Sequence, residues 1–558
     1  MKKVMCGIFL VFFCAFSAIA QKKIIHCGWD IPTPEYMKEN IQLMEKAPYD
    51  GISISLEAKN TDREGVIANR HTLWQNWRWK KEWFKESIAT LKAVPFEKFT
   101  DNFLLVCTLP GKMDMFDDEA WESVTHNIGL MAEIAKECKL KGLIFDPEFY
   151  QGKLFKFVPG KGHSFLEYKQ ISRKRGAQFM DAMTHQYPDM TLLTFFMLGS
   201  SMKNLDADHL EQSLQESSYG LFPAFINGML DAMPASFTLI DGGEEAYQAS
   251  CDQDFLQIYW NQKSDALKLV APENKNKYSS QVQVGFGLWI DPYIAFMHDP
   301  KNNYRPFRNF KNLIAPNGMN QLNFLSKNLR SALKYSDQYV WDWCEYGRWW
   351  PIKLADWRMK RCLKTPMKGA LWEQTAPGIT QAYNLARGSK FILERMNTEK
   401  ERKNLVKNFG FETAQGQRFP GWAFWQTKKS QENGGQPVLS TLGRNQSKCV
   451  ELKKVSYGSM IGYVDVMPGD VFYVEAWSKG DGVSIKVSWK DVQKRKLPDD
   501  KVKNIPLQTD YPEGWNKAMG VVIAPDHARQ LSLSLGAKNS TKRIFFDDVK
   551  IYKLNDIK

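Results

Sequence analysis

Two carboxylates, Asp146 and Glu148, stand one residue apart at the end of a short apolar run that begins at Gly142. In a strand, side chains alternate between the two faces, so both acids would point to the same side. Carboxylates donate and accept protons in general acid/base catalysis, and after a buried parallel strand they mark the active-site mouth of an α/β barrel. The competing interpretation is a helix start, where Pro147 followed by an acid is also common.

Two other segments supply acids at expected strand ends. Asp241 closes the apolar run 236–241, with Glu244 in the loop that follows, and Glu345 comes directly after the run 338–343. An apolar setting would raise the pKa of Glu345 and suit it to proton donation. The alternative is an ion pair with Arg348 or Arg358 inside a structural loop. We therefore expect Asp241 or Glu345 to act opposite Asp146 and Glu148.

Aromatic residues surround these acids, and the chain has 19 tryptophans. Their flat faces suit stacking on sugar rings, whereas core packing is the alternative for many of them, including those of the segment 70–79. Asp291 precedes a proline and is also explained as a turn residue. The expected substrate-binding residues are Trp29, Trp74, Trp77, Tyr150, Trp289, Asp291, Trp341 and Trp343.

The elements that must position these residues follow a β/α alternation from residue 22 onward. Apolar runs alternate with amphipathic stretches such as 118–138 and 165–187, where apolar residues recur at helical spacing. Eight strand candidates predict a closed (β/α)8 TIM barrel over residues 21–400. They span residues 24–29, 51–56, 103–109, 140–146, 191–196, 236–241, 282–290 and 338–343. An open doubly wound sheet gives the same alternation, but no Gly-rich phosphate motif follows the first run.

The pattern changes near residue 405, after a polar stretch at 397–403 that reads as a linker. Short alternating strands separated by turn signals predict an all-β sandwich over residues 401–558. The expected strands span residues 448–453, 460–466, 471–479, 483–489, 518–524, 530–537 and 543–554.

Several motifs of this region carry a resemblance. They are the opening Asn408-Phe-Gly-Phe-Glu412, Pro420-Gly-Trp422, Pro468-Gly-Asp470 and the closing residues 545–552. In this order they resemble the β-jelly-roll carbohydrate-binding modules of families 4, 9, 16 and 22. The resemblance implies that Glu412 and Asp548 would help hold a structural calcium, a cation that prefers oxygen ligands. It also makes the tryptophans stacking candidates, with some of them in the core: Trp422, Trp425, Trp477, Trp489 and Trp515.

A barrel joined to such a sandwich looks like a bacterial glycoside hydrolase, which mostly needs two carboxylates across the scissile bond. Asp146 and Glu148 are similar to the end of the Asp-x-Asp-x-Glu motif of chitinase-type barrels. The first Asp of that motif is missing, which puts a substrate-assisted mechanism in doubt. Barrels of the α-galactosidase type use carboxylates after strands four and six, and here the match is one of position only.

The chain ends and composition suggest a secreted protein. Residues 1–20 combine Lys2 and Lys3 with an apolar core and a small-residue end at Ala20, the pattern of a cleaved signal peptide, with a lipid anchor at Cys14 less favoured. We therefore expect a secreted or periplasmic protein without a transmembrane segment. The cysteines are widely spaced, so buried free thiols are the default, although an isolated disulfide stays open.

The expected activity is glycoside hydrolysis with Glu148 as general acid/base, Asp146 as its neighbour or the nucleophile, and no catalytic cofactor. A non-catalytic glycan-binding protein and a polysaccharide lyase are the alternatives. The net charge of +13 favours an anionic glycan, although a generic solvated surface also explains it. The basic residues are interleaved with acids and form no tract typical of nucleic-acid binding.

Overall fold

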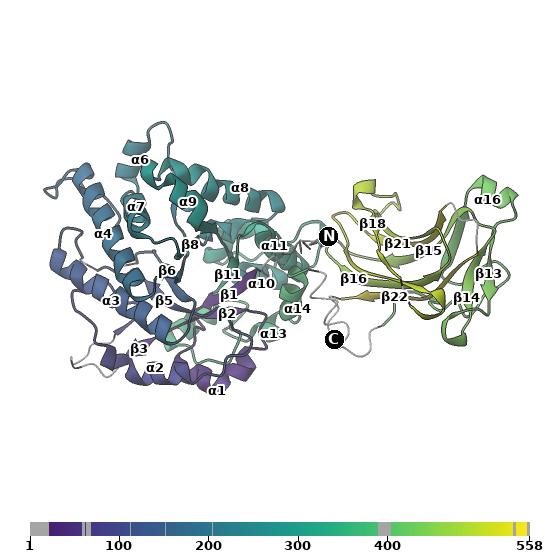
Figure 1. Ribbon diagram of the computed structural model, residues 1–558, viewed down its shortest axis with the longest axis horizontal. Helices are drawn as coiled ribbons and strands as arrows, with labels where there is room; N and C mark the ends of the chain where they lie inside the picture. Colours follow the sequence, from purple (N-terminus) through teal and green to yellow (C-terminus); the bar gives the residue numbers. More distant parts are fainter. Residues whose placement is uncertain are drawn as a thin grey trace, which may run out of the picture.

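A computed structural model shows two lobes side by side, a barrel in purple to green and a sandwich in green to yellow (Figure 1). The structure describes residues 22–58, 62, 68–111, 113–150, 152–202, 205–388, 403–509, 511–538 and 543–554. The predicted signal peptide lies outside the described residues. The predicted linker and the domain boundary at residue 400 lie there as well, apart from Lys403.

The barrel lobe is built on one sheet of parallel strands. Its order is β10-β11-β1-β2-β5-β6-β7-β8-β9, and β9 and β10 are separated only by Gly285, so the sheet forms a nearly closed barrel with eight strand positions. The Gly285 N–H donates to the Asp241 carbonyl at 2.8 Å and keeps this position paired with β8. The strands are β1 (Lys23–Gly28), β2 (Gly51–Ile54), β5 (Phe103–Cys107), β6 (Gly142–Asp146), β7 (Thr191–Thr194), β8 (Thr238–Asp241), β9 (Val282–Val284), β10 (Phe286–Trp289) and β11 (Tyr339–Cys344).

Helices surround the barrel, and the strands are buried nearly throughout because both of their faces are covered. The longest helix, α4, begins with a capping box between Ser164 and Glu167, and α3 begins with Asp117 capping the Ala120 N–H. The helices are α1 (Pro34–Met44), α2 (Lys85–Lys92), α3 (Asp118–Glu137), α4 (Phe165–Gln186), α5 (Leu198–Met202), α6 (Leu210–Glu216), α7 (Phe222–Ala232), α8 (Asp252–Lys263), α9 (Lys275–Gln281), α10 (Ile290–His298), α11 (Gln321–Tyr335), α12 (Asp356–Cys362), α13 (Trp372–Thr375) and α14 (Ile379–Ala386). A hairpin of β3 (Glu57–Ala58) and β4 (Ala68–Asn69) follows β2.

The second lobe packs two antiparallel sheets face to face. One has the order β12-β15-β21-β17-β18 and the other β13-β14-β22-β16-β20-β19. Alternate residues of both sheets form a common core that includes Phe472, Val474, Leu533 and Phe546. The elements are β12 (Trp422–Gln426), α16 (Lys428–Glu432), β13 (Gln436–Ser440), β14 (Cys449–Lys453), β15 (Tyr457–Asp465), β16 (Val471–Lys479), β17 (Val483–Lys490), β18 (Lys503–Asn504), β19 (Leu507–Gln508), β20 (Asn516–Ile523), β21 (Gln530–Lys538) and β22 (Ile544–Lys553).

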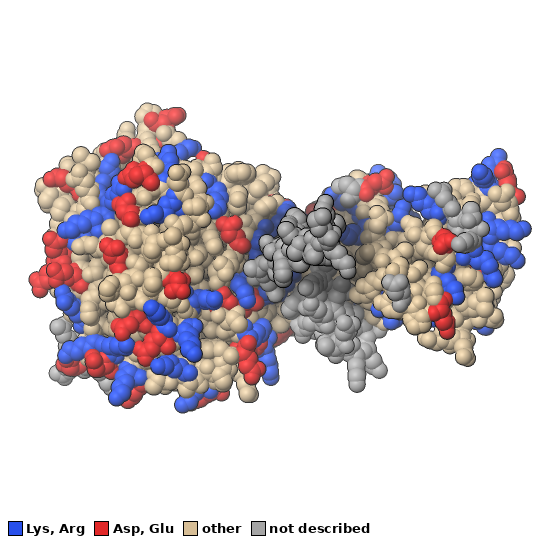
Figure 2. Space-filling model, viewed as in Figure 1, with Lys and Arg blue, Asp and Glu red and all other residues tan. Residues whose placement is uncertain are grey.

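The two lobes touch through a small apolar cluster with polar contacts beside it. Leu385 of α14 packs with residues of the six-stranded sheet, among them Val471, Tyr473 and Leu554. The Lys327 ammonium on α11 lies 3.3 Å from the Asp526 carboxylate. Figure 2 shows acidic and basic side chains interleaved over the visible face of both lobes.

The predicted fold class is confirmed, a TIM-type barrel followed by an antiparallel sandwich, and all eight predicted barrel strands are present. The pattern did not indicate the edge strands β12 and β13, which pair with β15 and β14. In the described part of the chain, no helix has both the length and the apolar character needed to cross a bilayer. All seven described cysteines are free thiols, and only Cys251 is exposed.

Candidate active site

Strand β6 ends at Asp146, and a tight turn places Glu148 directly beyond it. Pro147 has no N–H to continue the sheet, and the Asp146 Oδ1 accepts the Glu148 N–H at 2.9 Å. Glu148 therefore belongs to the loop rather than to the strand, and no helix begins here. The Tyr150 hydroxyl donates to the Glu148 carboxylate, while the rest of Tyr150 is 69% exposed. The predicted strand is confirmed as far as Asp146, whereas Glu148 lies beyond it.

The acids at this end of the barrel perturb one another. Burial, followed by the neighbouring Glu148 charge, holds the pKa of Asp146 well above its ordinary range. The pKa of Glu148 is also raised, first by burial and then by repulsion from Glu345, with the Tyr150 hydrogen bond acting in the opposite direction. Acids from β6 and from the loop after β11 therefore face the same space.

Glu244 is a fourth member of this group that the sequence interpretation mentioned only in passing. It follows β8, and burial together with the charges of Glu148 and Asp146 holds its pKa well above the ordinary value. Among the described residues, no hydrogen bond or ion pair reaches the Glu244 carboxyl. The sequence alone did not show that Glu244 lies close to the strand end, because Gly242 and Gly243 turn the chain back over the barrel.

The Asp241 carboxylate, by contrast, is hydrogen-bonded to backbone N–H groups. Its buried carboxylate accepts N–H groups of Met197 at 3.1 Å, Gly199 at 3.2 Å and Gly243 at 3.3 Å. Burial raises its pKa to about 6, against the effect of these hydrogen bonds. This geometry assigns Asp241 to fixing the loops after β7 and β8, and its predicted catalytic role stays a prediction without a contact that supports it.

Glu345 is held by a cation in an aromatic setting. The Arg358 Nη2 lies 3.2 Å from the Glu345 Oε1 and donates to the Glu345 carbonyl at 2.9 Å. The buried Arg358 guanidinium lies over the Trp29 ring at 4.3 Å and near the Trp357 ring at 5.7 Å. Both features of the sequence interpretation are therefore present, because Glu345 lies among aromatic rings and also makes an ion pair.

Some of the predicted substrate-binding aromatics do line this end of the barrel. Trp29 packs edge to face against Trp343 at 6.4 Å and against Trp357, which is 52% exposed. Trp341 is buried and stacks on Phe195, and its indole N–H donates to the Gly242 carbonyl at 2.8 Å. Trp29 and Trp343, both half-buried, are therefore the predicted residues with ring surface left for a ligand, and Trp357 joins them.

Trp74, Trp289 and Asp291 have structural surroundings instead. Trp74 is 1% exposed and stacks on Phe179 in the layer between strands and helices, so no ligand reaches its ring. Trp77 is half-buried and packs against Trp79 and Trp83. Trp289 is buried against Phe310, and its indole N–H donates to Asp291 at 2.9 Å. Asp291 is fully buried and contacts backbone N–H groups, which corrects its expected role as a substrate contact.

A surface hollow of about 1060 Å³ lies away from these acids. Residues of α3 and α4, including His126, Glu133 and His185, line it together with Trp79. None of the four acids takes part. The hollow therefore lies on the outer helix layer and not at the strand ends where the acids converge.

Among the sandwich tryptophans, only Trp425 offers an open ring, with 51% of the residue exposed and Tyr457 beside it at 6.1 Å. Trp422, Trp489 and Trp515 are core residues. Trp477 is buried, with the Arg444 guanidinium 3.5 Å above its ring. The resemblance implied that some of these tryptophans belong to the core, and all of them except Trp425 are buried.

The two residues predicted to hold a structural calcium, Glu412 and Asp548, both contact other groups of the protein, and the calcium stays a prediction. The Asp548 carboxylate is ion-paired with the Arg444 guanidinium, so a cation already neutralises it. The Glu412 carboxylate accepts the Lys448 N–H at 3.4 Å. Among the described residues, the acidic, histidine and cysteine side chains around Glu412 and Asp548 form no group of three that could hold a metal ion.

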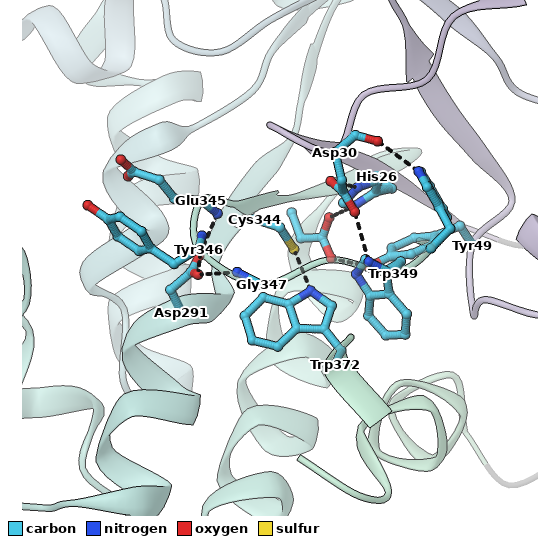
Figure 3. A network of polar contacts seen from close by, with 12 residues as sticks. His26, Asp30, Tyr49, Asp291, Cys344, Glu345, Tyr346, Gly347, Trp349 and Trp372 are labelled. Carbon is cyan, nitrogen blue, oxygen red and sulfur yellow. Dashed lines mark hydrogen bonds and ion pairs between the residues drawn. The ribbon is translucent and has the colours of Figure 1, made fainter. Parts of the chain in front are cut away.

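One buried group in the barrel has metal-binding residue types, namely His26, Asp342 and Cys344. Both His26 ring nitrogens are already hydrogen-bonded, Nδ1 to Asp342 at 2.9 Å and Nε2 to Asp30 at 2.8 Å. Burial opposes the charge of His26, but the two aspartates raise its pKa to about 10. The group is therefore a charged hydrogen-bond network rather than a vacant ligand set (Figure 3).

No family model matches this sequence, and no curated protein matches it. Among solved structures, the tailspike protein 4 enzymatically active domain of bacteriophage CBA120 is 17% identical, with a TM-score of 0.21 over 27% of this chain and 21% of that chain. The CBM22-1–GH10 modules of a Clostridium thermocellum endo-1,4-β-D-xylanase are 18% identical, with a TM-score of 0.22 over 27% of this chain and 29% of that chain.

Carbohydrate-binding modules also appear among these structures. The CBM22-1 xylan-binding domain of a Paenibacillus barcinonensis protein is 11% identical, with a TM-score of 0.22 over 28% of this chain and 99% of that chain. The matched part spans less than a third of the first two chains named. At these TM-scores the similarity is local and fixes neither a family nor a ligand for this protein.

Proposed function

We propose that the protein hydrolyses glycosidic bonds of a poly- or oligosaccharide by carboxylate acid/base catalysis. The observation that carries the proposal is that Glu148 and Glu345 follow the carboxyl ends of β6 and β11, on opposite sides of the barrel, and that the Glu345 charge helps to raise the pKa of Glu148. Two carboxyl groups that face a common space from opposite sides of a barrel mouth are what hydrolysis across a sugar ring requires.

The surroundings of the two groups differ in the way that catalysis needs. Burial and the nearby acids favour a proton on Glu148, so it suits the general acid that protonates the leaving oxygen. Glu345 is ion-paired with Arg358, whose guanidinium lies over the Trp29 ring, so it suits the carboxylate that acts as nucleophile or base. The Glu148 charge in turn helps to raise the pKa of both Asp146 and Glu244, after burial.

The charge of this site favours a neutral glycan over an anionic one. Four acidic residues lie at this end of the barrel, and the Arg358 guanidinium is already paired with one of them, Glu345. A uronate or sulfate would add a further negative charge in a partly buried space. The net positive charge of the whole chain is therefore not found at this site, where acidic residues predominate.

A lyase reaction has less support, because it needs a tyrosine or lysine that gives up its proton easily. The tyrosines nearest the acids are Tyr150, Tyr219 and Tyr247. Burial first and then the surrounding carboxylates raise the pKa of each, which is the wrong direction for a base. A glycan-binding role for the sandwich rests on Trp425 alone and is kept as a second proposal.

The test is a screen of neutral and anionic polysaccharides with the purified full chain, reading released reducing ends and product size by chromatography. We expect products from a neutral glycan with the wild type and none with the double variant Glu148→Gln/Glu345→Gln. Equal product release by both proteins would overturn the assignment. Secretion is proposed from residues 1–20 and is tested by sequencing the N-terminus of the exported protein.

A further inference from the structure

The loop that carries Glu345 is hydrogen-bonded at each end to a different buried aspartate. Strand β11 lies between β1 and β10 in the barrel, and the loop follows its last residue, Cys344. The chain after β1 supplies Asp30, and the first turn of α10, directly after β10, supplies Asp291. Both side chains are fully buried, and Figure 3 shows Asp291 below Glu345 and its two neighbours, with Asp30 at the other end of the loop.

Asp291 accepts three consecutive backbone N–H groups of this loop. Its Oδ2 accepts the Glu345 N–H at 2.7 Å, and its Oδ1 accepts those of Tyr346 at 2.7 Å and Gly347 at 3.3 Å. The Trp289 indole N–H is a fourth donor, at 2.9 Å from Oδ2. Both oxygens act only as acceptors, an arrangement that an ionised carboxylate satisfies and an amide does not.

Asp30 holds the far end of the same loop. Its Oδ2 accepts the Trp349 N–H at 2.8 Å, and its carbonyl accepts the Trp350 indole N–H at 2.7 Å. Its Oδ1 lies 2.8 Å from the His26 Nε2, so a cation balances the charge of Asp30. Asp30 therefore serves the buried network around His26 as well as the loop.

Asp291 differs because, within the described residues, it forms no ion pair. The charge that acts on it most is that of Glu345, whose backbone it holds. A buried carboxylate without a cation is costly for folding, and this one lies directly beside a proposed catalytic group. Its three hydrogen bonds to consecutive N–H groups point to a role in fixing the loop itself.

We propose that Asp291 is a positioning residue of the active site, whose carboxylate fixes the backbone of residues 345–347 so that Glu345 faces Glu148. The proposal rests on the proposed function, because it assigns a purpose to the position of Glu345. Asp291 touches no substrate in this role. It acts through three amide hydrogen bonds, and these can be measured whether or not the substrate is known.

The first experiment is amide hydrogen exchange on the full chain, comparing wild type with Asp291→Asn. In the variant, the side-chain amide would keep one acceptor oxygen, but its NH2 group would face backbone N–H donors. Exchange at residues 345–347 should therefore accelerate roughly tenfold or more. The rest of the barrel should exchange at the wild-type rate. Unchanged exchange at residues 345–347 would overturn the proposal.

The matched control is Asp337→Asn, at the amino end of the same strand. The Asp337 Oδ2 accepts the Val284 N–H at 2.8 Å, so it too is an aspartate that caps a neighbouring strand, but far from Glu345. We expect this variant to leave exchange at residues 345–347 unchanged. If Asp291→Asn and Asp291→Ser both fail to fold while Asp337→Asn folds, Asp291 supports the whole barrel and the proposal is wrong.

The second experiment uses a glycan that the wild type hydrolyses. Asp291→Asn should lower kcat about 10- to 100-fold and change KM less than about threefold, because Glu345 is displaced while the aromatic contacts remain. If Asp337→Asn lost as much kcat and kcat/KM as Asp291→Asn does, the assignment would be contradicted. If no glycan is hydrolysed, the proposed function fails, but faster exchange at residues 345–347 would still establish the grip of Asp291 on the loop.

Discussion

Two buried acids of the sandwich and the acids at the barrel mouth have opposite surroundings. In the sandwich, Glu475 and Glu451 have cations beside them, whereas burial and the neighbouring Asp548 charge raise the pKa of Asp547 to about 6. Glu475 lies 3.0 Å from both Lys517 and Lys550, and Glu451 makes a two-armed pair with Arg543 at 2.6 and 2.7 Å. At the barrel mouth, acids face other acids, and the pKa of Glu148 is raised where that of Glu475 is lowered.

This difference separates acids that stabilise a fold from acids that are poised to react. Burial penalises both sets, but in the sandwich lysine side chains and the Tyr473 hydroxyl outweigh the penalty for Glu475. At the barrel mouth the penalty is left uncompensated for Asp146 and Glu244. Groups that are kept at a cost to stability are candidates for catalysis.

The largest expected effect comes from removing the acids of the barrel mouth. Glu148→Gln and Glu345→Gln should each lower kcat on the wild-type glycan by roughly 10²–10⁴-fold, because proton transfer or nucleophilic attack is lost. The matched variant in the sandwich is Glu451→Gln, which should keep kcat within about twofold. Reducing-end assays on the three variants make the comparison, and a large loss in Glu451→Gln would erase the distinction between the lobes.

The reverse experiment removes an acid that stabilises. Glu475→Gln leaves Lys517 and Lys550 beside each other without their shared carboxylate. We expect the free energy of unfolding of the sandwich to fall by about 1–3 kcal/mol, measured by denaturant titration followed through sandwich signals. Glu148→Gln should not destabilise the barrel, because it removes a repelled charge. A destabilised Glu148→Gln would contradict the comparison.

The pH dependence of barrel stability follows from the same surroundings. Burial raises the pKa of Asp291 from 3.8 to about 7, and the two aspartates raise that of His26 from 6.5 to about 10. In both cases the folded state binds more protons than the unfolded state, so stability falls as pH rises, from about 4 to 7 through Asp291 and from about 6.5 to 10 through His26.

Thermal unfolding of the barrel at pH 5, 7 and 9 checks this expectation. The midpoint should fall at each step, and Asp291→Asn should flatten the part below pH 7. A midpoint that rises from pH 5 to 9 would show that paired acids dominate the barrel, as they do around Glu475 in the sandwich.

The smallest expected effect concerns the exposed tryptophan of the sandwich. Trp425→Ala should weaken binding of a glycan to the full chain by about 3- to 10-fold without changing the unfolding midpoint, because the ring is open to solvent. Trp489→Ala, the buried counterpart, should instead lower the midpoint. Affinity electrophoresis and thermal unfolding separate the two, and unchanged binding in Trp425→Ala would remove the glycan-binding role of that residue.

The sequence predicted the barrel well because buried parallel strands leave a clear signal. Residues 142–146 end in Asp146 and residues 339–344 are followed by Glu345, and both runs form strands as expected. The edge strand Gln436–Ser440 carries no such run, because only one of its five residues is buried.

The site was harder to predict because its decisive contacts are long-range. Glu148 and Glu345 are visible as strand-end acids, but the facing position of Glu244 depends on a glycine turn. The backbone grip of Asp291 joins residues more than fifty positions apart, and sequence favoured a simple turn residue. Likewise Trp74 and Trp77 share one residue pattern, and only packing shows that Trp74 is in the core.

The most direct test of the account is the titration of Glu148 itself, followed by carboxyl ¹³C NMR on protein labelled at glutamate. The resonance that disappears in Glu148→Gln should titrate above the ordinary glutamate pKa of 4.5, and the one that disappears in Glu475→Gln should titrate below it. Replacing Glu345 by Gln should lower the pKa of Glu148 toward its ordinary value, because the Glu345 charge helps to raise it. A Glu148 carboxyl that titrates at or below 4.5 would contradict its role as the proton donor of the site.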